Sequence, residues 1–394
     1  MLDRSLSRSF RGPLLACLAF VLAFGVSLAS AKTVHVRSWE AGGRDWKSGA
    51  NWSNAMFSLT AAFNKCGPGD RVLIEPGTYY YGGTEKLTRS GNNSNWINVE
   101  VASRTYNGQT KVIIDSRNHN GDALEISGNY IWINGQNNSN YHGLQVRNSK
   151  SNGIKIVSRN NRATHHVTIR NVDVRNSTYA GIVSSRGKEN NFQNRTGPKP
   201  YRLRILNSNV TNNCRINSDR SASSAWPGAI AIFESGDVRV ENTNIFKNYG
   251  EGMLFMGSTD CWIQNSYVGN NFSANVYFDN VVNGKCRYNN IGGNLAGYRK
   301  GNTTYGANGV VIANEQQFYT RWNPFQNSRN IEVRGNDIYD CGYGFWFWRD
   351  WGNNAITVQN NKNELTNTTL QGNSFSRNFQ NKKIDDWGNG NNIQ

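Results

Sequence analysis

The sequence predicts an all-β protein, a right-handed parallel β-helix (a solenoid) with an N-terminal capping helix. Three observations support this fold. Short apolar strands recur along the chain, an Asn recurs at the end of a second type of strand, and the central repeats step by 23 residues. Strands this short cannot bury a core alone, so each coil must stack on the next one.

The first repeated unit is a short apolar strand that usually follows Gly or another small residue. Period-two alternation places Ile154 and Ile156 on one face of such a strand and Lys155 on the other. The unit recurs at 153–156, 181–183, 229–232, 252–255, 275–278, 309–312 and 344–347. Stacking these strands would bury one continuous apolar column.

The second repeated unit alternates apolar and polar residues and ends in Asn. It occurs at 167–171, 203–207, 238–242 and 261–265, and Gly335 takes the place of Asn after the strand at 331–333. Asn and Gly both tolerate the left-handed backbone of a tight turn. We therefore expect tight turns here, where stacked Asn side chains can also form hydrogen-bonded ladders.

The spacing of the repeats separates a β-helix from an antiparallel sandwich. The steps from Ile230 to Met253 and from Met253 to Val276 are both 23 residues, which suits one coil of three short strands. Longer steps elsewhere indicate loop insertions, at 186–201, 214–227 and 315–329. A sandwich would require hairpin turns such as Asn-Gly between paired strands, and these are sparse.

The capping helix is predicted before the first strand. Ser53 is a suitable N-cap for a helix that continues to about Lys65, with Met56, Leu59 and Phe63 on one face. The turn residues at 66–70 end this helix, and the first strand follows at 71–74. A helix over the open end would protect strand edges from aggregation.

The chain begins with a predicted signal peptide at residues 1–31. Three Arg precede an apolar run at 14–28, and Ala29-Ser30-Ala31 is a small-residue cleavage site. The alternative, a membrane anchor, would require about 20 apolar residues. We expect a secreted protein, extracellular or periplasmic, without a membrane segment and with one domain over residues 32–394.

The charge of the chain favours an anionic partner. The formal net charge is +16, and removal of the leader leaves +14. We expect the partner of a basic, exported protein to be an acidic polysaccharide and not nucleic acid. The alternative is that the charge provides only solubility or retention in a cell wall. We expect a monomer.

Five cysteines follow the leader. Because this number is odd, at least one thiol stays free. Alignment of the coils places Cys261 and Cys286 at equivalent positions, 25 residues apart in sequence. Equivalent positions on adjacent coils are about 4.8 Å apart, within reach of a disulfide. A Cys261–Cys286 disulfide is therefore predicted, with free, buried thiols as the alternative.

Two stretches of the sequence resemble the pectate-lyase-like parallel β-helix superfamily. They are the segment 63–79, which contains the letters GPGDRVLIEPGTY, and the segments 121–133 and 143–149. The resemblance implies the β-helix fold over the whole mature chain and a polysaccharide lyase, epimerase or hydrolase activity. Related lyases carry a calcium-binding Asp cluster and a Lys or Arg base, and this sequence has no clear Asp cluster of that kind.

The substrate groove is expected along the outward face of the first repeated strand. Its predicted outward column is Lys155, Val183, Ala231, Leu254, Tyr277, Val311 and Trp346. Substrate-binding candidates are residues that can stack on sugar rings or clamp carboxylates, namely Tyr277, Trp346, Trp348, Arg186 and Trp322. The alternative for the Trp residues is packing beneath a neighbouring loop.

Candidate catalytic residues come from the same groove and its loops. A uronate lyase needs a neutralised carboxylate and a base, for which we select Arg349, Arg321 and Lys155. A hydrolase needs two carboxylates, and Glu234 and Asp279 lie two coils apart, roughly 10 Å. Asp279, Glu315 and Glu234 could hold Ca²⁺, which prefers several oxygen ligands.

Two classes of function follow from these observations. The first is a lyase, or an epimerase or hydrolase, that acts on an acidic uronate-containing glycan. The second is a noncatalytic surface or matrix protein that binds glycans through its basic and aromatic face. Turnover of the glycan separates the two.

Overall fold

The computed structural model describes residues 31–136, 142–187, 197–221, 226–315, 328–349, 369–384 and 392–393. The predicted signal peptide, apart from Ala31, lies outside these residues, and residues 32–394 form one compact unit. No helix in the described part of the chain is long and apolar enough to cross a bilayer.

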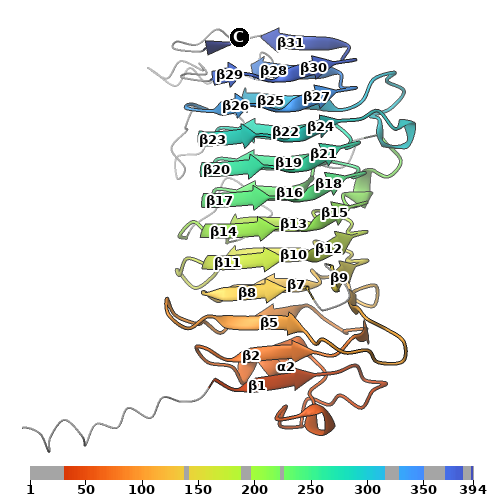
Figure 1. Cartoon of the computed structure of the whole chain (residues 1–394), viewed down its shortest axis with the longest axis vertical. Coiled ribbons are helices and arrows are strands. Elements are labelled where there is room, and N and C mark those ends of the chain that lie inside the picture. Colours follow the sequence, from red (N-terminus) through yellow and green to blue (C-terminus); the bar gives the residue numbers. More distant parts are fainter. Residues whose placement is uncertain are drawn as a thin grey trace, which may run out of the picture. The chain divides into compact units, whose positions relative to one another are not determined.

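The unit is a parallel β-helix in which each coil contributes one strand to each of three sheets (Figure 1). Every strand pair between coils is parallel, and the chain visits the sheets in the repeating order A, B, C, as in β20, β21 and β22. The predicted fold class is therefore confirmed.

Sheet A contains β1 (Thr33–Val36), β2 (Arg71–Ile74), β5 (Ile97–Val101), β8 (Ile131–Asn134), β11 (His165–Arg170), β14 (Tyr201–Leu206), β17 (Gly236–Glu241), β20 (Thr259–Gln264), β23 (Val282–Arg287), β26 (Glu332–Arg334), β29 (Thr369–Gln371) and β32 (Asn392–Ile393).

Sheet B contains β3 (Gly77–Tyr79), β6 (Val112–Asp115), β9 (Leu144–Arg147), β12 (Val172–Arg175), β15 (Asn209–Thr211), β18 (Asn244–Phe246), β21 (Tyr267–Gly269), β24 (Asn290–Gly292), β27 (Asp337–Tyr339) and β30 (Ser374–Ser376).

Sheet C contains β4 (Glu85–Leu87), β7 (Leu124–Ile126), β10 (Ile154–Ser158), β13 (Ile182–Arg186), β16 (Gly228–Phe233), β19 (Glu251–Met256), β22 (Ala274–Asp279), β25 (Asn308–Asn314), β28 (Tyr343–Arg349) and β31 (Gln380–Ile384).

The register of sheet C produces the apolar column that the sequence predicts. Ile230 pairs with Met253, and Met253 pairs with Val276, one coil further along. All three side chains are fully buried. Equivalent positions of successive coils thus lie above one another, and the interior is a continuous apolar column.

The Asn residues that end the second repeated unit occupy left-handed turns. Asn171, Asn207, Asn242 and Asn265 have φ between 48° and 58°, and Gly335 has φ 65° at the same place in its coil. Left-handed backbone is unfavourable for most side chains, whereas Asn and Gly tolerate it. The predicted turns between sheets A and B are confirmed.

Buried Asn ladders form mainly at other positions, inside the coils. The side-chain amide of Asn248 donates to Oδ1 of Asn271 at 2.9 Å, and Oδ1 of Asn248 accepts the backbone N–H of Asn213 at 2.9 Å. A second ladder runs from Asn289 to Asn336 at 2.9 Å and on to Asn373. These ladders satisfy backbone groups where the chain bends between sheets.

The capping helix is shorter than predicted. A 3₁₀ turn, η1 (Trp52–Asn54), comes first, and α2 (Leu59–Asn64) begins after the N-cap Ser58, whose side chain accepts a hydrogen bond from the backbone of Ala61. The prediction of a helix from Ser53 was wrong because Met56 instead forms a parallel bridge with Val36. Extended backbone at Met56 cannot belong to a helix.

The predicted Cys261–Cys286 disulfide is wrong. All five cysteines of the described chain are free and buried. Cys261 pairs with Gly284, and Cys286 lies two residues further along its strand, opposite Ile263. That offset separates the two Cα atoms by roughly 8 Å, which exceeds disulfide reach. The alternative of free, buried thiols is the one observed.

We predict that the thiols stay reduced and react slowly in the folded protein. Burial raises the pKa of Cys66 and of Cys286 to about 12, so little thiolate is present at neutral pH. A thiol reagent should react with the native domain about 1,000-fold more slowly than with the unfolded chain, because a pKa three units higher lowers the thiolate fraction by that factor. Fewer than five titratable thiols after unfolding without reductant would contradict the assignment.

The Asn ladder predicts a large stability difference between two Asn substitutions. Asn248→Ala removes the partner of a buried backbone N–H and should cost about 2–4 kcal/mol of unfolding free energy. Asn265→Gly, at an exposed left-handed turn, should change it by less than about 0.5 kcal/mol. Denaturant titration measures both, and equal losses would argue against the ladder.

Candidate active site

The outward column of sheet C lies at the positions that the sequence predicts. Val183, Ala231, Leu254, Tyr277 and Val311 pair in register, with Lys155 before and Trp346 after them. These five side chains are all at most 5% exposed, although they point away from the core. Sheet C therefore carries a second apolar cluster on its outer face.

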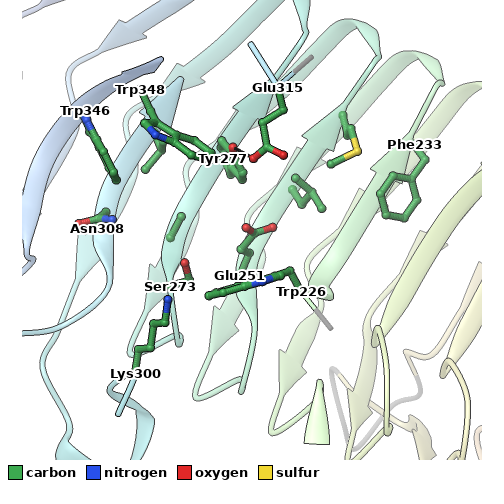
Figure 2. A pocket seen from close by; sticks show the side chains of 14 residues that line it. Trp226, Phe233, Glu251, Ser273, Tyr277, Lys300, Asn308, Glu315, Trp346 and Trp348 are labelled. Atoms are coloured by element: carbon green, nitrogen blue, oxygen red, sulfur yellow. Dashed lines mark hydrogen bonds between the residues drawn. The ribbon is translucent and has the colours of Figure 1, made fainter. Parts of the chain in front are cut away.

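A cavity of about 610 Å³ opens on this cluster (Figure 2). Its lining residues are mostly apolar or aromatic, with two carboxyl groups and one ammonium group among them. They are Trp226, Phe233, Glu251, Leu254, Met256, Ser273, Ala274, Tyr277, Lys300, Asn308, Val311, Glu315, Trp346 and Trp348. A cavity of this kind, with few polar groups on an apolar wall, is typical of a ligand site.

Glu251 is the buried acid of the cavity. It opens strand β19, and its register partner on the preceding coil is Gly228, which has no side chain to pair with it. No hydrogen bond or ion pair to its carboxyl group is found within the described residues. Burial, followed by the nearby charge of Glu315, raises the pKa of Glu251 well above 4.5. Burial therefore favours the protonated form of Glu251, the form that can donate a proton.

Glu315 is the second acid, and Tyr277 and Asp279 position it. The hydroxyl of Tyr277 donates a hydrogen bond to Oε1 of Glu315, and the backbone N–H of Glu315 donates to Oδ1 of Asp279 at 2.9 Å. Burial and the charges of Asp279, Glu315 and Glu251 raise the pKa of Tyr277 well above 10. Tyr277 thus remains a neutral hydrogen-bond donor that holds the Glu315 carboxyl group.

Aromatic rings form the walls around these acids. The ring centroids of Trp346 and Trp348 are 5.8 Å apart, and those of Trp348 and Tyr277 are 6.5 Å apart. Across the cavity, Nζ of Lys300 lies 4.3 Å from the ring centroid of Trp226. Partial burial lowers the pKa of Lys300. Exposed aromatic faces of this kind suit the flat, apolar faces of sugar rings.

Two predicted residues, Arg186 and Glu234, pair with each other beside the cavity. The Arg186 guanidinium binds the Glu234 carboxylate through two contacts of 2.9 Å, and both side chains are almost buried. Phe233, directly before Glu234, lines the cavity. A buried ion pair of this kind holds the end of β16 in place, and its role in catalysis stays a prediction.

Other predicted residues lie elsewhere or outside the described part. Lys155 is four coils from Tyr277, roughly 19 Å, and binds Asp122 at 3.2 Å. Arg321 and Trp322 lie outside the described residues, as does the side chain of Arg349. Trp346 and Trp348 both line the cavity, as expected for substrate-binding residues.

The described carboxylates do not form a calcium site. No group of three or more potential metal ligands converges in the described residues. Asp279 and Glu315 are neighbours, but Glu234 is held by Arg186. These described donors are fewer than the several oxygens that Ca²⁺ requires, and a calcium requirement stays a prediction.

Glu251 and Lys300 were not among the candidates predicted from the sequence, and Trp226 was expected only as an aromatic residue of the loop insertion at 214–227. The available signal for Glu251 was its position, since an acidic residue directly precedes the apolar strand 252–255 of the most regular repeat. Trp226 and Lys300 come from turns between sheets B and C, whose paths the repeat does not define. Only the folded chain brings them to the same cavity.

No protein-family model matches the chain. No curated protein matches its sequence either. Solved structures do: the pectate lyase Pel9A matches with a TM-score of 0.52 and 14% identity, over 92% of this chain and 79% of that one. An alginate lyase from Paenibacillus sp. str. FPU-7 matches with a TM-score of 0.50 and 16% identity, over 85% of this chain and 96% of that one. The chain therefore shares the parallel β-helix fold of these enzymes, as the sequence predicted, and at these identities the likeness shows the fold alone.

The raised pKa of Glu251 predicts a pH-dependent stability. The folded state binds this proton more tightly than the unfolded state, so stability is lost as pH rises from 4.5 towards the raised folded pKa. Glu251→Gln removes this loss and should raise the unfolding midpoint at pH 7.5 by about 2 °C or more. Near pH 3.5 the variant and the parent should unfold at similar temperatures. A shift of equal size at both pH values would mean that Glu251 is not protonated by burial.

Proposed function

We propose that this chain is a secreted glycan-degrading enzyme that hydrolyses glycosidic bonds in the cavity on sheet C. In this proposal Glu251 is the general acid and Glu315 is the second carboxyl group. The leader at residues 1–31 would direct export, and the fold, which polysaccharide lyases also have, is compatible with this class of activity.

The observation that carries the proposal is the pair of acids with different surroundings in one aromatic cavity. Glu251 has no hydrogen-bond partner among the described residues and has a raised pKa, whereas Glu315 accepts a hydrogen bond from Tyr277. Glycoside hydrolysis needs one protonated acid and one carboxylate at the same bond. In the proposal, Glu251 is the protonated acid and Glu315 is the carboxylate.

The chemistry follows from these two states. Glu251 donates its proton to the leaving glycosidic oxygen as the bond from that oxygen to the anomeric carbon breaks. Glu315 accepts a proton from a water molecule whose oxygen bonds to the anomeric carbon. Glu251 opens β19 and Glu315 directly follows β25, two coils further along, and the two carboxyl groups line the same cavity from opposite ends of their strands. Tyr277 is a positioning residue, because it holds the Glu315 carboxylate.

The cavity also constrains the sugar at the cleaved bond. Its lining contains two carboxyl groups and only one ammonium group, that of Lys300. A uronate carboxylate beside Glu315 would be repelled, so an uncharged sugar unit is favoured there. The acidic units that the basic chain favours would then lie elsewhere along the polymer.

A uronate lyase is the second candidate, and Lys300 is the observation that favours it. Its lowered pKa increases the fraction of neutral amine, the form that removes a C5 proton. Protonated Glu251 could share its proton with the substrate carboxylate. The products distinguish the candidates, because a lyase forms an unsaturated uronate that absorbs ultraviolet light and a hydrolase does not.

The two acids predict loss of activity without loss of fold. On a panel of neutral, acidic and mixed glycans, Glu251→Gln and Glu315→Gln should each lower kcat by about 10²–10⁴, as expected for the loss of a proton donor or acceptor. Reducing-end release measures the rate, and circular dichroism checks the fold. Glu100→Gln, in β5 of sheet A, is the matched control and should retain full activity.

Three results would redirect the proposal. Ultraviolet-absorbing products that depend on Lys300 would establish the lyase instead. Inhibition by a chelator would show a metal requirement that the described carboxylates do not explain. Tight glycan binding without turnover on any substrate would establish the noncatalytic alternative.

A further inference from the structure

We propose that the outer face of sheet A, from β8 to β23, binds an anionic polysaccharide. This surface is separate from the cavity on sheet C. The inference rests on sheet A alone, and it would hold whichever reaction the cavity performs.

A single register column on sheet A presents one polar or aromatic side chain from each coil. In chain order the column is Trp132, Thr168, Arg204, Arg239, Trp262 and Lys285. Successive members are about 4.8 Å apart, because that is the spacing of hydrogen-bonded strands. This step is similar to the length of one sugar unit in an extended polymer.

The cations in this column are held in place by Trp262. The guanidinium carbon of Arg239 lies 4.3 Å from the Trp262 ring centroid, and Nζ of Lys285 lies 4.0 Å from it. Arg239 comes from the preceding coil and Lys285 from the following one, so the two cations cover opposite faces of the ring. This arrangement orders two long side chains before any ligand arrives, which lowers the entropic cost of binding.

The positive charge of the face is only partly neutralised. Asp237 is the shared acidic partner of Arg202 at 3.8 Å, Arg204 at 2.9 Å and Arg239 at 3.9 Å. Lys285 has no ion pair with any described residue. Glu241 adds a second nearby carboxylate at Arg204, and these two acids leave the three guanidinium groups and the Lys285 ammonium group with an excess of positive charge, complementary to a polyanion.

A shallow pocket of about 490 Å³ lies on the same face, at β5, β8 and β11. Trp96, Trp132 and Arg170 line it, and Trp132 is 39% exposed. The Nε of Arg170 is buried and has no hydrogen-bond partner, and no ion pair to Arg170 occurs in the described part of the chain. In such a pocket the aromatic ring can stack on a sugar unit, and the unpaired guanidinium beside it can bind the carboxylate of that sugar.

The column favours an acidic polysaccharide over single-stranded nucleic acid. Binding of single strands depends on aromatic rings that stack on successive bases. Both faces of Trp262 are already covered by cations, so this ring offers no stacking surface. Carboxylates on a polyuronate need only the cations, which the column presents coil by coil.

The test is binding of the full domain to polygalacturonate, measured by affinity electrophoresis at low salt. The double variant Arg239→Gln/Lys285→Gln should bind about tenfold more weakly, as expected from loss of two exposed charge-assisted contacts. Trp132→Ala should weaken binding to a similar degree. The charge-matched control is Lys65→Gln/Lys150→Gln, and the control for the ring is Trp46→Ala, all at exposed positions away from this face.

Retention of affinity by both controls, together with unchanged cleavage of a short soluble substrate by all variants, would support the inference. Equal weakening by the two double variants would overturn it, because net charge alone would then explain binding. Competition by oligothymidylate as strong as that by an oligogalacturonate of equal charge would overturn the choice of ligand. Loss of cleavage without loss of binding would count against the cavity chemistry and not against this surface.

Discussion

Hydrogen bonding between coils in strict register is the constraint on which the rest of the molecule depends. A strand of three to seven residues has too little apolar surface to fold alone, but its N–H and C=O groups are satisfied by the coils on either side. Register then decides which side chains meet. Ile230, Met253 and Val276 form one column because each lies opposite the next. The Asn ladders secure the bends in the same way.

The same register also aligns outward-facing side chains from successive coils, and these form continuous surfaces that can have a function. On sheet C the outward column becomes apolar and aromatic in the middle coils, and Glu251 and Glu315 reach one cavity from strands two coils apart. On sheet A the outward column carries Arg239, Trp262 and Lys285. A solenoid can therefore hold a reaction site on one face and a polymer-binding surface on another. Neither requires the core to change.

The repeated features of the fold could be predicted from the sequence. Features at positions that depart from the repeat could not. The strands and the outward column that contains Tyr277 follow from period-two alternation, the left-handed turns follow from the recurring Asn and Gly, and the structure has all of them. The Cys261–Cys286 disulfide failed because alignment by apolar pattern misplaced Cys286 by two residues, which periodicity cannot detect since two residues return to the same face. Glu251 was missed because a lone acid before a strand has meaning only when Gly228, Tyr277 and Glu315 surround it. Its altered acidity comes from burial, which no local pattern records.

The pKa of the Glu251 carboxyl group, measured by carbon NMR in the parent and in Glu315→Gln, tests the central claim most directly. Coils stacked in this register place the two acids in one largely apolar cavity. The account predicts a value well above 4.5 in both proteins and a lower value in the variant, because one neighbouring charge is gone while burial remains. An ordinary value in the parent, or the same value in both proteins, would contradict it.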